Sequence, residues 1–85
     1  MDMNHRPAVR DFIAHLLNEQ DDRADFGDDD SLVRSGRLDS LAVTKIVMFL
    51  ESRYRVDFAR IEFDPDRLDS VNAILAVIAE SALSR

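Results

Sequence analysis

The chain has 85 residues, of which 46% are hydrophobic and 33% charged, a composition typical of a single small globular domain spanning residues 1–85. It contains no cysteine, which excludes disulfides, thiolate chemistry and a cysteine-bound zinc ion. The formal net charge of -6 disfavours binding to nucleic acid and favours partners that carry a basic patch. The first residues lack the pattern of a signal sequence, and no apolar run approaches the roughly 18 residues of a membrane span. We therefore expect a cytoplasmic protein that does not insert into membranes.

The first predicted helix begins near Pro7, because proline suits the first positions of a helix. Asn4 or His5 precedes it as a candidate cap. Apolar residues then recur at helical spacing and predict one buried face: Val9, Phe12, Ile13, Leu16 and Leu17. His15 lies beside this face, and neither histidine has a second histidine or a cysteine at ligand spacing. We interpret both histidines as surface side chains.

Helical periodicity is lost between Gln20 and Asp39, a segment that we call the acidic loop. Residues 21–30 contain six acids and one arginine, so the acids repel one another. Gly27 and Gly36 further disfavour a helix, and loops longer than about 12–15 residues are often functional. We expect four apolar residues to hold this loop against the core: Phe26, Leu32, Val33 and Leu38.

The acidic loop does not match a calcium-binding loop. Counted from Asp25, the required central glycine falls on Asp30 and the final glutamate on Gly36. Counted from Asp28, the central glycine falls on Val33. We therefore predict no metal site.

A second helix is predicted to begin at Ser40. Its buried face consists of apolar residues at helical spacing: Val43, Ile46, Val47, Leu50 and Tyr54. Asp39 or Ser40 can cap this helix, since either side chain can accept a hydrogen bond from an unpaired amide. We expect the Ser40 hydroxyl to lie in solvent, where a loop meets a helix. Leu41 and Met48 lie outside the buried face and are expected to be exposed.

The remaining chain predicts a connection, a short helical turn and a last helix. Phe58 is expected to be buried in the connection, and Asp64 to cap a turn that has Pro65 at its first position. The last helix begins at Asp69 or Ser70 and extends to about residue 83. Its predicted buried face contains Val71, Ile74, Leu75, Ile78 and Ala82. The predicted fold is all-α, a small bundle of three main helices and one short helix, with a long acidic loop after the first helix.

Three serines follow an aspartate in similar surroundings. Asp30-Ser31-Leu32 and Asp39-Ser40-Leu41 share one tripeptide, and Arg37-Leu38-Asp39-Ser40 recurs as Arg67-Leu68-Asp69-Ser70. Ser31 does not open an amphipathic helix, and we interpret Ser70 as an ordinary helix cap. Ser40 alone combines an upstream glycine, a long loop and an apolar-faced helix.

The segment from Asp30 to Phe58 resembles the acyl carrier protein family, which includes peptidyl and aminoacyl carriers. That family has Ser-Leu, then glycine, then Asp-Ser-Leu at the start of a helix that ends in Leu-Glu and an aromatic residue. The matching residues here are Ser31-Leu32, Gly36, Asp39-Ser40-Leu41, Val47-Met48, Leu50-Glu51 and Tyr54. The family also has the same order of helix, long loop, helix, short helix and helix, so the resemblance extends over nearly the whole chain.

The resemblance implies that Ser40 carries 4′-phosphopantetheine, derived from coenzyme A, whose thiol bears an acyl or aminoacyl thioester. The protein would then be a monomeric carrier and not an enzyme. The implied partners are a phosphopantetheinyl transferase, an acyl- or aminoacyl-loading ligase or transferase, and a downstream synthase or acyltransferase. Fatty acid, polyketide and nonribosomal peptide biosynthesis are the pathways in which such carriers act.

The charge of the second helix differs from that of fatty-acid carriers, which usually have acids on its exposed face. The matching positions here are Ala42, Lys45, Ser52 and Arg53. We therefore expect a free-standing carrier of a specialised pathway. Partner recognition is expected from Asp39, Leu41, Ala42, Lys45 and Met48. An apolar crevice on the side of Val47, Phe49, Leu50 and Ile74 is expected to shelter the cargo.

Two other functions, a hydrolytic enzyme and an interaction module, are alternatives to the carrier. A hydrolytic enzyme would need Ser40 as nucleophile, but no Gly-x-Ser-x-Gly sequence surrounds it and neither histidine has an orienting partner. The alternative is a carrier-like helical interaction module without a prosthetic group, because a fold does not fix a function. The intact Asp39-Ser40-Leu41 sequence favours the carrier.

Overall fold

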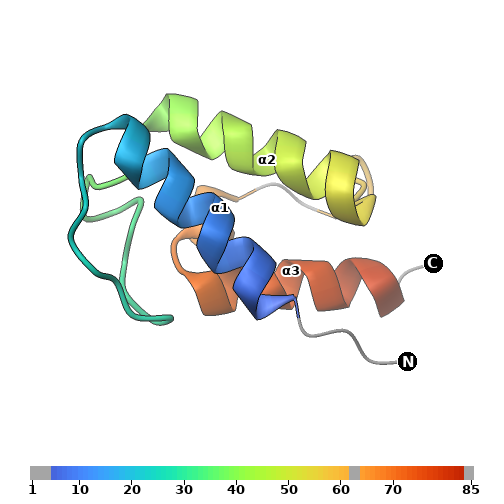
Figure 1. The fold of residues 1–85 in the computed structure, drawn as a ribbon. Helices are drawn as coiled ribbons and strands as arrows, with labels where there is room; N and C mark the ends of the chain where they lie inside the picture. Colours follow the sequence, from blue (N-terminus) through green and yellow to red (C-terminus); the bar gives the residue numbers. More distant parts are fainter. Residues whose placement is uncertain (1–4, 62–63, 84–85) are drawn as a thin grey trace.

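The computed structural model describes residues 5–61 and 64–83. They form three α-helices and one 3-10 turn: α1 (Arg6–Glu19), α2 (Ser40–Tyr54), η1 (Pro65–Leu68) and α3 (Val71–Leu83). The acidic loop connects α1 to α2, which confirms the predicted all-α fold and its order of elements (Figure 1). No helix in these described ranges is long and apolar enough to cross a membrane.

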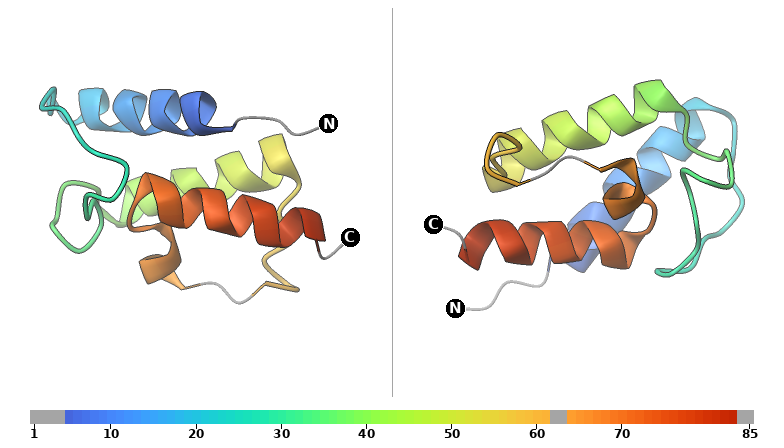
Figure 2. Two further views of the ribbon diagram at one scale, coloured as in Figure 1. Left: turned by 90° about the horizontal axis from the view of Figure 1, so that it is seen from below. Right: turned by 180° about the vertical axis from the view of Figure 1, so that it is seen from behind.

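The start of α2 lies at the same end of the molecule as the end of α1 and the acidic loop (Figures 1 and 2). The start of α1 and the end of α3 lie at the opposite end. The loop therefore lies at the same end of the molecule as the helix start that carries Ser40.

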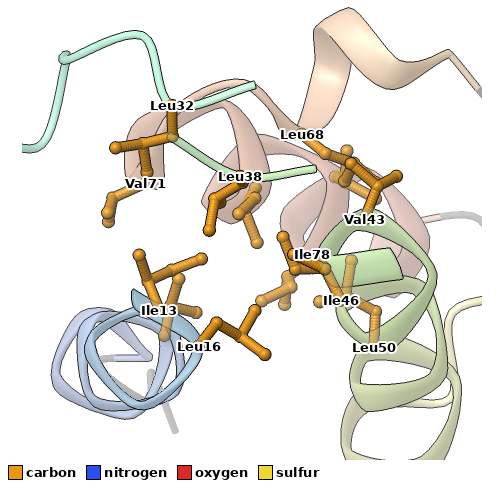
Figure 3. Packing of buried hydrophobic residues seen from close by; sticks show 14 of the residues in the cluster. Ile13, Leu16, Leu32, Leu38, Val43, Ile46, Leu50, Leu68, Val71 and Ile78 are labelled. Atoms are coloured by element: carbon orange, nitrogen blue, oxygen red, sulfur yellow. The ribbon is translucent and has the colours of Figure 1, made fainter. Parts of the chain in front are cut away.

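Side chains from all three helices, from η1 and from the loop meet in one hydrophobic cluster (Figure 3). The residues of α1 in this cluster are Val9, Ile13, Leu16 and Leu17, as predicted. Phe12 is half-buried at the edge of the cluster, where its ring stacks on that of Phe49 with centroids 4.2 Å apart. Pro7 lies in the first turn of α1, while His5 at the cap position makes no capping hydrogen bond with its side chain. The other predicted cap, Asn4, lies outside the described residues.

The buried face of α3 differs in part from the predicted one. Val71, Ile74 and Ile78 are buried as expected, but Leu75 is half-buried and Ala82 is exposed. Val77 and Ser81 are buried in their place. The prediction added Leu75 and Ala82, which lie four residues after Val71 and Ile78, whereas the structure buries the residues three positions after Ile74 and Ile78. The contact face is therefore turned toward Val77 and Ser81.

The acidic loop is held by the apolar residues predicted for this role. Leu32 and Leu38 are fully buried, Phe26 is nearly so, and Val33 packs against the cluster from a half-buried position. In the connection after α2, Phe58 is only half-buried, so its predicted burial is wrong in degree. Among the described residues of this connection, Val56 and Ile61 are buried, and no periodic signal marks them because the segment is short and irregular.

Candidate functional site

Ser40 is the first residue of α2, and its side chain is exposed. Asp39 adopts an extended backbone and is the cap, since its Oδ1 accepts a hydrogen bond of 2.9 Å from the Ala42 amide. The Ser40 carbonyl accepts a hydrogen bond of 3.0 Å from Thr44 Oγ1. Within the part of the chain that the structure describes, the Ser40 hydroxyl makes no hydrogen bond. The choice between Asp39 and Ser40 as cap is thus resolved in favour of Asp39, and the exposed Ser40 hydroxyl at a loop-to-helix junction is confirmed.

The two competing serines have hydroxyls that are engaged in the protein. Ser31 Oγ donates a hydrogen bond of 3.0 Å to Asp69 Oδ1. Ser70 Oγ accepts a hydrogen bond of 3.1 Å from the Ala73 amide, which confirms its role as the cap of α3. Ser40 therefore differs from both in having a hydroxyl that the fold does not use.

A groove with a volume of about 600 Å³ lies beside Ser40. It is lined by the acidic loop, the start of α2 and η1, through Val33, Gly36, Leu38, Asp39, Ser40, Val43, Thr44 and Pro65. Gly36 has a φ of +86°, and a Cβ atom there would meet nothing within 4 Å. The backbone conformation, and not a lack of space, therefore favours glycine at this turn.

The residues of the predicted cargo crevice, Val47, Phe49, Leu50 and Ile74, differ in burial, since Val47 and Phe49 are only half-buried. Leu50 and Ile74 are buried in the core, and the Phe49 ring lies against the rings of Phe12 and Tyr54. The Phe12, Phe49 and Tyr54 rings therefore cover part of this side of α2, and the crevice there stays a prediction. The apolar groove near Ser40 lies at the start of α2.

The exposed apolar residues of α2 lie as predicted, but Ala42 does not. Leu41 and Met48 are 63% and 60% exposed. Ala42 is only 5% exposed, so its expected place on an exposed recognition face is wrong. Ala42 lies one helical turn before Ile46 on the buried face of α2, and the predicted face included Ile46 but not Ala42.

Lys45 lies at the edge of a groove between the end of α1 and the start of α2. Its Nζ is 3.1 Å from Glu19 Oε1, so its charge is paired within the protein. The Lys45 ammonium lowers the pKa of the Glu19 carboxyl, mainly through this hydrogen bond. Sequence analysis identified Lys45 as a cation on this helix but did not predict its ion pair with Glu19, because the two residues lie on different helices.

Two acids of the loop, Asp22 and Asp28, are paired with arginines. Asp28 accepts hydrogen bonds of 2.5 Å from both Arg6 and Arg10 of α1, which lower the pKa of its carboxyl, Arg10 most strongly. Arg37 donates hydrogen bonds of 3.0 and 3.1 Å to Asp22 and lowers the pKa of that carboxyl in the same way. The loop is therefore fixed by ion pairs across the fold, which charge counting along the sequence could not reveal.

Asp69 is the residue of this region that sequence reasoning missed. Its Oδ1 accepts hydrogen bonds of 2.9 Å from the amides of Val33 and Arg34, in addition to the bond from Ser31. The repeated Asp-Ser pair was the signal that could have identified Asp69. A helix start needs only one of the two side chains as its cap, so the other is available for a contact elsewhere.

Neither histidine is placed to activate Ser40. The His5 ring packs edge-on against Tyr54 at 4.7 Å, and His15 Nε2 lies 3.4 Å from Glu19 Oε2. Among the described residues, no group of three or more His, Cys, Asp or Glu side chains is arranged to hold a metal ion.

Comparisons of this chain with protein-family models, with curated proteins and with solved structures gave no match. Its function is therefore inferred from the site itself and from the residue pattern around Ser40.

Proposed function

We propose that this protein is an acyl or aminoacyl carrier protein that holds its cargo as a thioester on 4′-phosphopantetheine attached to Ser40. The observation that supports this most directly is the exposed Ser40 hydroxyl, which does not cap α2 because Asp39 does. The Asp39-Ser40-Leu41 sequence and the order of the helices are those of the carriers that the chain resembles.

The surroundings of Ser40 fit a phosphodiester. The backbone amides and the dipole at the start of a helix favour a negative group by roughly 0.3–1 kcal/mol at an exposed site. The Asp39 carboxylate next to it would repel a phosphate, so we assign to Asp39, besides capping, the attraction of a transferase with a basic patch. The prosthetic group would supply the thiol that this cysteine-free chain lacks.

The groove beside Ser40 is suited to an apolar part of the arm or of its cargo. Val33, Leu38 and Val43 contribute apolar side chains to its walls. Leu41 and Met48 remain exposed on α2, where partner enzymes would pack against them. These partners would be the phosphopantetheinyl transferase, a loading ligase or transferase, and a downstream synthase or acyltransferase.

We place this carrier in a specialised pathway and not in fatty-acid synthesis. The exposed side of α2 presents two apolar side chains, Leu41 and Met48, and a lysine whose charge is paired with Glu19. A fatty-acid enzyme with a basic docking patch would find no row of acids on this helix.

The test is incubation of the purified protein with coenzyme A, Mg²⁺ and a broad-specificity phosphopantetheinyl transferase, followed by intact-mass measurement. We expect the mass to increase by one phosphopantetheinyl group in the wild type, Ser31→Ala and Ser70→Ala proteins, and no increase in Ser40→Ala. An unmodified wild type would support the alternative, an interaction module without a prosthetic group. Modification of the Ser40→Ala protein would show that the assigned serine is wrong.

A further inference from the structure

Asp69 connects the start of α3 to the acidic loop. Its Oδ1 accepts hydrogen bonds from the Val33 and Arg34 amides and from Ser31 Oγ, at 2.9, 2.9 and 3.0 Å. Its carbonyl accepts a further hydrogen bond of 2.7 Å from the Leu32 amide. Because Ser70 caps α3, the Asp69 carboxylate is available for the loop. One residue therefore fixes four consecutive residues of the loop, 31–34.

Backbone hydrogen bonds continue from this fixed segment toward Ser40. The Gly36 amide donates to the Val33 carbonyl at 3.0 Å, and the Leu38 amide donates to the Leu32 carbonyl at 2.8 Å. Val33, Gly36 and Leu38 also line the groove beside Ser40. The conformation of this wall thus depends on the acceptor that Asp69 provides.

The Asp69 carboxylate is a strong acceptor. Partial burial raises the pKa of Asp69, but the hydrogen bonds from the Arg34 amide, Ser31 and the Val33 amide outweigh it, so the pKa lies below its usual value. The group is therefore ionised at neutral pH, and hydrogen bonds to an ionised acceptor are roughly twice as strong as neutral ones.

We propose that Asp69 is a positioning residue for the modification of Ser40. By holding residues 31–34 it presents the groove wall to the transferase in one conformation, so that little loop ordering is needed on binding. This inference rests on the proposed function of Ser40. Because α2 and Asp39 hold the Ser40 backbone independently of Asp69, we expect the effect on KM and not on kcat.

The experiment compares the kinetics of phosphopantetheinyl transfer to the wild type, Asp69→Ala and Asp69→Asn. In Asp69→Ala we expect KM to rise about tenfold with kcat within about twofold, as for a lost preorganisation. Asp69→Asn keeps an acceptor oxygen, so its KM should stay within about threefold of the wild-type value. All proteins are assayed well below their unfolding midpoints, with helix content checked by circular dichroism.

Asp66→Asn is the matched control. Asp66 pairs with the side chain of Arg34, at 2.9 Å to the Nε atom, and this pair is exposed. The variant therefore removes a contact to the same loop residue without removing an acceptor of a backbone amide. We expect its KM to equal the wild-type value.

A wild-type KM in folded Asp69→Ala, or an Asp69→Asn protein as impaired as Asp69→Ala, would overturn the proposal. Amide hydrogen exchange in the wild type provides a test that needs no variant, because the Val33 and Arg34 amides should be protected. Exchange of these two amides at the rate of an unstructured chain would also overturn it. A wild type that is not modified at all would overturn the proposed function, and protected amides in that protein would show that the loop contact itself had not failed.

Discussion

The starts of α2 and α3 have the same four-residue sequence but use it differently. In Arg37–Ser40 and Arg67–Ser70 the leucine is buried in the core, and the arginine pairs with an acid elsewhere in the fold, Asp22 in the first case and Glu80 in the second. The roles of the last two residues are exchanged. At α2 the aspartate caps the helix and the serine hydroxyl is exposed, whereas at α3 the serine caps and the aspartate holds the loop.

A helix start can leave one polar side chain of an Asp-Ser pair available without loss of its cap. A helix start has several unpaired amides, but one side chain is enough to cap it. Whichever residue of the Asp-Ser pair does not cap is available for another contact. At α2 this is an exposed hydroxyl, and at α3 it is a carboxylate that accepts three hydrogen bonds.

The largest expected effect comes from replacing Ser40 and Ser70 by alanine, one at a time. Ser40→Ala should abolish modification and change the free energy of unfolding by less than about 0.5 kcal/mol, because the exposed hydroxyl caps nothing. Ser70→Ala should leave modification intact and cost about 0.5–2 kcal/mol, as for other lost caps. Intact mass and urea unfolding measure the two quantities. The reverse pattern of stabilities would mean that the assigned caps are wrong.

Loss of Leu41 should slow transfer of the prosthetic group without destabilising the fold. Leu41 is mostly exposed next to Ser40, so Leu41→Ser removes an apolar contact for a partner but little core packing. We expect kcat/KM to fall about tenfold, as for a lost interface anchor, with a change in Tm of only a few degrees. Leu83→Ser, at a still more exposed leucine on α3, is the control and should have no effect on transfer. Equal losses of rate and stability in Leu41→Ser would show that Leu41 belongs to the core.

The two aspartates should differ in stability as well as in role. Asp39→Ala removes a cap and should cost about 0.5–2 kcal/mol. Asp69→Ala removes the acceptor of two amides and should cost more, about 1–3 kcal/mol, because the partly buried Val33 amide loses its partner whereas the exposed Arg34 amide can bind water instead. Urea unfolding of both variants checks the order, and a smaller loss in Asp69→Ala would contradict it.

The Asp69 contribution should also depend on pH. The pKa of its carboxyl is lower in the folded protein than in the unfolded chain, where it is about 3.9. The stabilisation is therefore fully present above that unfolded value and is lost as the pH falls through the lower folded pKa. The difference in unfolding free energy between the wild type and Asp69→Asn should thus be constant from pH 7 to about pH 5 and shrink below about pH 4. Because Glu19, Asp22, Asp28 and Asp66 also have lowered pKa values, only the difference between the two proteins isolates Asp69. A difference that grows in acid would reverse the assigned sign.

The sequence predicted the helices well because apolar periodicity is a local signal. The face of α1, the exposed Ser40, Leu41 and Met48, and the four apolar residues of the loop all follow from spacing along the chain. The contacts of Asp69 with the loop, and of Glu19 with Lys45, could not be predicted in this way. These contacts join residues that are 26 to 38 positions apart in the chain. Polar side chains form no periodic pattern from which such contacts could be predicted. The burial of Ala42 was missed because alanine is too small to mark a helix face by its hydrophobicity.

The smallest expected effect concerns the choice of partner enzyme at the start of α2. Lys45 is paired with Glu19, so a single charge change there would also break an ion pair. The double variant Glu19→Lys with Lys45→Glu keeps the pair in the opposite direction and places an acid on α2, as in fatty-acid carriers. Ala42→Asp is not suitable for this purpose, because Ala42 is buried and its replacement would bury a charge.

We expect the wild-type holo protein to be a poor substrate of a fatty-acid malonyl transferase and the double variant to be a few-fold better, mainly through the association rate. The gain should shrink as the salt concentration rises, because exposed charges are screened. The free energy of unfolding should change by only a few tenths of a kcal/mol, as for exposed ion pairs in general. Lys45→Gln, which removes the cation without adding an acid, is the control and should give less than the full gain. Efficient malonyl loading of the wild type, unchanged in the double variant, would show that charge on α2 does not select the partner and that this protein acts as an ordinary fatty-acid carrier.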